Sequence, residues 1–281
     1  MISVPSWQAL LFVPVGAERH LANAIRLRPD AIILDLEDAI APAAKPEARA
    51  RLRSAQQLIH AAGVDCVIRI NTQLRDVVDD LAAVDIDHVA ALMLPKVEDI
   101  RGLQNVTELT GGKVGLIALI ETPAAVQALP AIAAFPQLVG LMLGSEDYAA
   151  SLGVSPDGGS LAHLAAQIGV AAAARGLLGI GFPGSLANFQ ALDLYASQIA
   201  QGRQLGLRTV AAIHPAQLPV IRNALAPTHA EITWATKVLQ AHHAHEGAVL
   251  AMEGTMIDAP VIQRARNIMR AMHAQARPQE I

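Results

Sequence analysis

Eight apolar runs, each followed by a segment with helical spacing, constrain the fold of this chain more than any other feature. Runs of this length fit strands buried on both faces of a parallel sheet, and the stretches 18–27 and 46–61 have the apolar spacing of amphipathic helices. Eight such repeats predict a (β/α)8 barrel, the TIM barrel. The runs read ALLFVPV, AIILDLED, DCVIRIN, VAALMLPKV, GLIALIET, LVGLMLGSED, GLLGIGF and TVAAIHP.

The chain is long enough for one barrel and a short extension. Its 281 residues are 53% hydrophobic, which is enough to bury one large core. After His214 and Pro215 the spacing becomes helical, and no low-complexity linker separates this tail from the barrel. We therefore predict a catalytic barrel over residues 1–218 and a helical extension over 219–281, which serves as a lid or an oligomer contact.

Charge and hydropathy exclude several classes of partner. The formal net charge is −4 and the basic residues are scattered, so the chain lacks the basic footprint of a nucleic-acid-binding protein. No run reaches the roughly 18 apolar residues that a membrane span needs, and the N-terminus has no secretory pattern. We expect a cytoplasmic protein that acts on a small molecule, without nucleic acid or membrane as partner.

Two carboxylates follow two successive apolar runs, Glu121 in LIALIETP and Asp147 in LMLGSEDYAASLG. The C-terminal ends of barrel strands meet at one face, where barrel enzymes carry their active sites. A carboxylate beside a hydrophobic core is costly unless a positive charge lies nearby. Its hard oxygen atoms favour Mg²⁺ or Mn²⁺ as that charge. The sequence therefore predicts a metal site. The alternative is that each residue only caps a helix or a turn.

Arg69 lies in the third run, VIRIN. Strand alternation directs its side chain to the same side as Val67 and Asn71, and a guanidinium can hold a carboxylate through two parallel hydrogen bonds. We interpret Arg69 as a substrate-binding residue. The alternative is a structural salt bridge to Glu37 or Asp38, which follow the second run.

Eight ordered motifs, between Leu10 and Ala259, carry a resemblance to a known family. They resemble the citrate lyase beta-subunit-like branch of the HpcH/HpaI aldolase family, which includes citramalyl- and malyl-CoA lyase-like proteins. The resemblance implies a Mg²⁺-dependent carbon–carbon lyase that acts on a 2-hydroxyacyl thioester such as citramalyl-, malyl- or citryl-CoA. The motifs are LLFVPV, LDLEDAIAPAAKPEAR, VIRIN, LPKVE, LIETP, GSEDYAASLG, AIHPAQL and GTMIDAP.

The resemblance also implies roles for single residues. Glu121 and Asp147 correspond to the metal ligands, and Arg69 corresponds to the arginine that binds the substrate carboxylate. Arg69 and Glu121 thus count as both catalytic and substrate-binding. A bound cation there would act as a Lewis acid on the reacting oxygen.

Asp258, in MID, resembles an acid/base residue that family members supply from the C-terminal lid of a neighbouring subunit. The resemblance accordingly implies a homo-oligomer, a trimer or a hexamer. From the residues alone, Asp258 fits equally well as the N-cap of a helix that begins at Ala259 and Pro260. Glu37 and Asp38 are expected to orient metal-bound water or to bind Arg69.

The chain departs from its relatives at three positions where they often carry a basic residue: it has Ala17, Val210 and Thr255. Because lysine and arginine anchor phosphates, this weakens the case for a coenzyme A substrate more than the case for the metal. Three alternatives stay open. They are a metal-dependent aldolase of free 2-hydroxy or 2-keto acids, a Schiff-base aldolase that uses Lys96, and a noncatalytic subunit of a larger lyase.

Overall fold

The computed structural model describes residues 2–156, 159–244, 250–252 and 255–275. The chain divides into two compact units, Met1–Ala224 and Leu225–Ile281. The boundary expected between residues 218 and 219 falls inside helix α9 (Gln217–Leu225). Among the described residues, no helix is both long and apolar enough to cross a bilayer.

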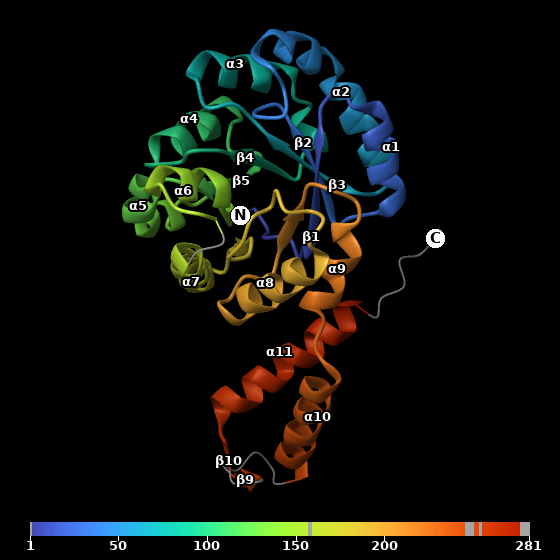
Figure 1. Ribbon diagram of the computed structural model, residues 1–281, viewed down its shortest axis with the longest axis vertical. Helices are drawn as coiled ribbons and strands as arrows, with labels where there is room; N and C mark the ends of the chain where they lie inside the picture. The colour runs from blue at the N-terminus through green and yellow to red at the C-terminus, as the bar shows by residue number, and fades with distance from the viewer. Residues whose placement is uncertain (1, 157–158, 245–249, 253–254, 276–281) are drawn as a thin grey trace. The chain divides into compact units, whose positions relative to one another are not determined.

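The first unit is a barrel of parallel strands with the helices outside it, which confirms the predicted (β/α)8 fold (Figure 1). The strands pair in the order β7-β6-β5-β4-β3-β2-β1-β8, and an isolated bridge between Ile180 and Thr209 joins the two edges. All eight expected runs contain a strand. They are β1 (Ala9–Pro14), β2 (Ala31–Asp35), β3 (Asp65–Arg69), β4 (Ala91–Leu94), β5 (Gly115–Ile120), β6 (Leu138–Leu143), β7 (Leu178–Ile180) and β8 (Val210–Ala212).

Helices follow every strand, and two follow β6. The first two lie within a residue of the expected ranges. The helices of this unit are α1 (Glu18–Leu27), α2 (Lys45–Ala61), α3 (Leu74–Ala83), α4 (Arg101–Leu109), α5 (Pro123–Ala133), α6 (Ser145–Leu152), α7 (Gly159–Arg175), α8 (Leu192–Gln204) and α9, with short 3-10 turns η1 (Pro42–Ala44) and η2 (Ile86–His88). The barrel interior is filled by alternate strand residues such as Ile33, Val67 and Ile117, so polar side chains have room only at the strand ends.

Gly169, inside α7, lies against the backbone of Leu205. A Cβ there would come within 1.9 Å of the Leu205 carbonyl oxygen, which requires the helix or the turn to move. We expect Gly169→Ala to lower the free energy of unfolding by about 1–3 kcal/mol, as overpacking does, measured by urea denaturation. The control is Gly102→Ala in α4, where an added Cβ meets no atom within 4 Å; equal losses in both variants would contradict this account.

The second unit is a small helical cluster with its own core. Helix α10 (His229–Ala244) packs on α11 (Ala259–Gln275) through a core that includes Val238, Ile257 and Ile268. Strands β9 (Leu250–Met252) and β10 (Thr255–Ile257) form an antiparallel pair between them. The sequence predicted the helices of this segment but not the two strands, since three residues are too few for a periodic signal.

Candidate active site

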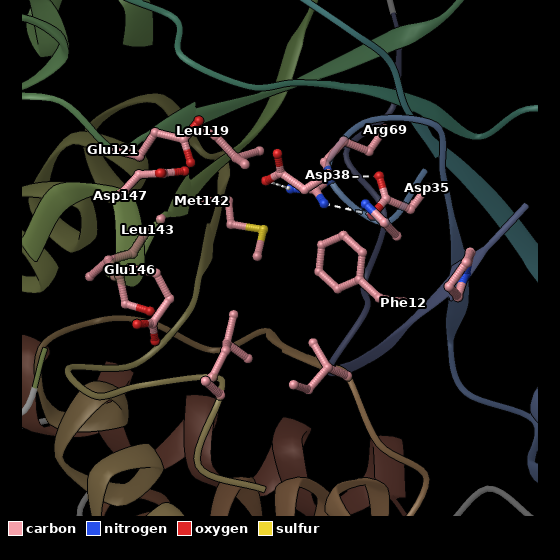
Figure 2. Close-up of a pocket in the computed structure, with 17 residues that line it drawn as sticks. Phe12, Asp35, Asp38, Arg69, Leu119, Glu121, Met142, Leu143, Glu146 and Asp147 are labelled. Carbon is pink, nitrogen blue, oxygen red and sulfur yellow. Dashed lines mark hydrogen bonds and ion pairs between the residues drawn. The ribbon is translucent and has the colours of Figure 1, made fainter. Parts of the chain in front are cut away.

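Glu121 and Asp147 lie where the sequence expects them, after β5 and in the first turn of α6. Both line one cavity of about 420 Å³ at the ends of the barrel strands. Figure 2 shows the two side chains next to each other on one side of this cavity. Glu121 is only 3% exposed, whereas Asp147 is exposed. The structure therefore brings the expected pair together at a single site.

Two backbone features hold the Glu121 carboxylate in place. The Lys96 N–H donates a 2.6 Å hydrogen bond to Glu121 Oε1, and Lys96 reaches this position with a left-handed φ of 50°, an uncommon conformation for a lysine. On the other side, Gly144 leaves the space that Glu121 fills: a Cβ at residue 144 would lie 2.4 Å from both Cβ and Oε2 of Glu121. The carboxylate is thus fixed from β4 and β6.

The pKa of the Glu121 carboxyl group is higher than that of an ordinary glutamate. Burial raises its pKa from 4.5 to about 7; the Lys96 N–H opposes this rise, and the negative charge of Asp147 adds to it. A buried carboxylate beside a second one is a place where a cation would be stabilising.

Arg69 points into the same cavity from the end of β3, where carboxylates of β2 and of the segment after it hold its guanidinium. Its Nε and Nη2 donate to the two oxygens of Asp35, at 2.8 and 2.6 Å. The guanidinium also lies over the Phe12 ring, 5.2 Å from the centroid. Although burial lowers the Arg69 pKa, the hydrogen bonds to Asp35 outweigh it and raise the pKa above its ordinary value. Arg69 is thus a permanently charged group with a fixed orientation.

Glu37 and Asp38 surround the remaining nitrogen of Arg69. Arg69 Nη1 lies 3.0 Å from Glu37 Oε2 and 3.5 Å from Asp38 Oδ2; the first contact is an ion pair without hydrogen-bond geometry. Burial raises the pKa of Glu37 to about 7, against the effect of Arg69. The salt bridges that the sequence left as an alternative are therefore present, with Asp35 as the strongest partner. Asp35 and Arg69 occupy paired positions on β2 and β3.

Three further cavity residues were not singled out from the sequence. Ser145 begins α6 and is 2% exposed, and its hydroxyl has no hydrogen-bond partner among the described residues. Glu146 accepts a 2.5 Å hydrogen bond from Ser185, which ties the segment after β7 to the start of α6. Phe12 forms part of the apolar wall. In the sequence, only their positions within the motifs could have marked these residues as part of the site. A serine after a strand is common in turns and by itself indicates no function.

Two other expected residues lie in different surroundings. The Lys96 side chain is 45% exposed, and its ammonium lies 3.8 Å from Glu37 Oε1. Lys96 lines a neighbouring cavity of about 290 Å³ with Asn71. Asp258 lies in the second unit, where its Oδ1 accepts a 3.2 Å hydrogen bond from the Val261 N–H at the start of α11. The helix cap that the sequence allowed for Asp258 is thus observed.

The residues present fit a magnesium ion in one particular way. In the part of the chain that the structure describes, no three histidine, cysteine, aspartate or glutamate side chains are arranged to hold a metal. A cation would instead rest on the pair Glu121 and Asp147 and take its other ligands from water or substrate. Mg²⁺ binds in this manner, through one or two carboxylates with several waters retained.

The raised pKa of Glu121 and of Glu37 gives a testable dependence of stability on pH. The folded state binds these protons more tightly than the unfolded state, so the contribution is full below about pH 4.5 and is lost as the pH rises through about 7. For Glu121, we expect a loss on the order of 3 kcal/mol; for Glu37, we expect a loss in the same direction. Urea unfolding with a chelator present, compared between wild type, Glu121→Gln and Glu37→Gln, measures it; identical pH profiles would contradict the assignment.

The chain is similar to known proteins over nearly its whole length. Residues 8–215 match the model of the HpcH/HpaI aldolase/citrate lyase family. A citrate lyase subunit beta-like protein of Mycobacterium tuberculosis is 35% identical over 276 residues, which cover 95% of this chain and 94% of that protein. A (3S)-malyl-CoA thioesterase of Cereibacter sphaeroides is 31% identical over 281 residues, covering 95% of each.

A solved structure agrees with the fold. The structure of CitE from Mycobacterium tuberculosis in complex with magnesium, acetoacetate and coenzyme A has a TM-score of 0.80 to this chain at 31% sequence identity. The alignment covers 95% of this chain and 98% of that one.

Proposed function

Because the chain belongs to the HpcH/HpaI aldolase/citrate lyase family, we propose that it is a magnesium-dependent carbon–carbon lyase. Its substrate is a thioester of the citramalyl-, malyl- or citryl-CoA type, in which the second carbon from the thioester carbonyl carries both the hydroxyl group and a carboxylate. The observation that carries this proposal is the pair Glu121 and Asp147, which share one cavity with Arg69. Similar proteins described in complex with magnesium and with acetoacetate or coenzyme A support the same assignment.

The reaction defines what the site must do. The bond between the hydroxyl-bearing carbon and the carbon next to the thioester carbonyl breaks; the hydroxyl loses its proton, and the released carbon gains one. Mg²⁺ held by Glu121 and Asp147 would supply Lewis-acid polarisation of the substrate oxygens. The Lys96 N–H and Gly144 keep Glu121 in the position that this requires.

Arg69 and the start of α6 would bind the substrate carboxylate. Arg69 keeps Nη1 on the side of Glu37 and Asp38, and Asp35 prevents its side chain from turning. Helix α6 begins at Ser145 without a side-chain cap, so its first N–H groups are available to an anion. A substrate carboxylate between these groups would place the neighbouring oxygen towards Glu121 and Asp147.

Proton transfer needs a further group, for which Asp258 is our candidate. Its Oδ1 accepts the capping hydrogen bond at the start of α11, and its Oδ2 would exchange the proton. We propose that residues 219–281 act as a lid and oligomer contact, and that Asp258 reaches the cavity of a neighbouring subunit in a trimer or hexamer. Asp258→Asn, mixed with an Arg69→Ala protein, would recover activity in mixed oligomers if the two residues act in trans.

The test of the function is the release of a 2-oxo acid from the candidate thioesters and from the corresponding free acids. We expect turnover that a chelator abolishes and that Mg²⁺, or Mn²⁺, restores. Turnover that persists in chelator, with borohydride trapping of Lys96, would replace this proposal by a Schiff-base aldolase. Tight magnesium binding without turnover of any candidate would point to a noncatalytic subunit.

A further inference from the structure

The candidate active-site cavity has two separate groups of polar side chains. Glu121, Glu146 and Asp147 stand on one side, and Arg69 with its carboxylate partners stands on the other. Figure 2 shows Met142 between these groups, with Phe12 beside the Arg69 group. The rest of the wall is mostly hydrocarbon, from Phe12, Leu119, Met142, Leu143, Leu186 and Ile213. The polar groups thus flank an apolar wall.

The positive charge in this cavity comes from Arg69 and is already paired with neighbouring carboxylates. Arg69 is the only basic residue among the described residues that line it, and two of its nitrogens donate to Asp35 while the third faces Glu37 and Asp38. Lys96 lines the neighbouring cavity and faces Glu37. One substrate carboxylate can be held by Mg²⁺, Arg69 and the first N–H groups of α6. A second would meet hydrocarbon or further carboxylates, and an unpaired buried charge is strongly disfavoured.

We propose, on the basis of the proposed function, that the substituent on the hydroxyl-bearing carbon of the substrate is an uncharged alkyl group. Cleavage then releases pyruvate or a longer alkyl 2-oxo acid, and not oxaloacetate. Leu186 and Met142 determine this specificity, because they form the apolar wall where the substituent lies. The volume of about 420 Å³ is within the usual range of small-molecule sites and has room for more than a methyl group.

Direct binding of 2-oxo acids tests the inference. The probes, titrated by calorimetry into the full-length protein with Mg²⁺, are pyruvate, 2-oxobutanoate, 4-methyl-2-oxopentanoate and oxaloacetate. The last two are close in shape, but 4-methyl-2-oxopentanoate has an isopropyl group where oxaloacetate has its second carboxylate. We expect 2-oxobutanoate to bind about fourfold more tightly than pyruvate, the gain of one buried CH₂. We expect oxaloacetate to bind at least about tenfold more weakly than 4-methyl-2-oxopentanoate, given the cost of an unpaired charge.

A substitution at Leu186, which is only partly buried, separates specificity from folding. Leu186→Ala should remove most of the preference for 2-oxobutanoate over pyruvate, because the shorter side chain no longer reaches the terminal methyl group of the ethyl substituent. Leu186→Arg should improve oxaloacetate binding relative to 4-methyl-2-oxopentanoate. Melting temperatures close to wild type establish that both variants fold, and the outward Leu109→Ala in α4 is the matched control, since Leu109 is 53% exposed.

The outcomes distinguish this inference from the proposed function. Oxaloacetate binding as tightly as the isosteric alkyl acid, or an unchanged preference in Leu186→Ala, overturns the inference alone. Absence of magnesium-dependent binding of any 2-oxo acid overturns the proposed function, and the inference falls with it.

Discussion

Glu121→Gln is expected to lower the turnover of the magnesium-activated protein on the order of a thousandfold or more, which is the scale for loss of a metal ligand or a preorganised charge. The change keeps the shape of the side chain and its acceptor oxygen for the Lys96 N–H, but it removes the negative charge that faces Asp147. Magnesium affinity, measured by calorimetry, should fall together with turnover. Asp147→Asn should act in the same direction.

The matched control is Glu108→Gln, an exposed position on α4 that should leave both quantities unchanged. Unfolding in chelator adds an independent check on Glu121→Gln. Because burial raises the Glu121 pKa to about 7, the neutral glutamine should stabilise the metal-free protein at about pH 8, and Mg²⁺ should stabilise the variant less than wild type. A variant that kept its turnover and its magnesium affinity would remove Glu121 from the site.

Gly144→Ala is expected to lower turnover on the order of a hundredfold without any change in the chemical groups of the site. The added Cβ would lie 2.4 Å from Glu121 Cβ, an atom near the backbone that cannot swing aside, so the carboxylate must shift. Displacement of a reacting group by about 1 Å can cost this much. The φ of Gly144 is −95°, which alanine adopts without strain, so the effect comes from the contact alone.

Kinetics of Gly144→Ala are compared with those of Gly102→Ala, whose added Cβ meets no atom within 4 Å. Magnesium titrations should show weaker binding in Gly144→Ala and wild-type binding in the control. Full activity in Gly144→Ala would mean that the position of Glu121 is not critical.

The barrel could be predicted from the sequence because buried parallel strands leave a strong pattern. Runs such as GLIALI are apolar at every position, and each ends at a charged or small residue. The same break marks Glu121 and Asp147 as neighbours at one face, since consecutive strands of a barrel are adjacent. The run that contains β7, GLLGIGF, gives the weakest strand signal because glycines and the proline that follows interrupt it, and the strand itself has only three residues.

The identity of the carboxylate that binds Arg69 could not be predicted from the sequence. Its pairing with Asp35 depends on the register between β2 and β3, which one sequence does not define. Strand alternation gave the correct side, but two aspartates and a glutamate stand within four residues of one another in LDLED, and only the register selects Asp35. The hydroxyl of Ser145 and the apolar wall around Met142 likewise depend on how loops from distant strands meet.

The most direct test of the central claim is the location of the metal by X-ray anomalous scattering from crystals grown with Mn²⁺ and pyruvate. The account predicts one strong peak in the barrel cavity, in contact with both Glu121 and Asp147, with a pyruvate oxygen beside it. A peak elsewhere on the chain, or a well-ordered cavity without a peak, would contradict it.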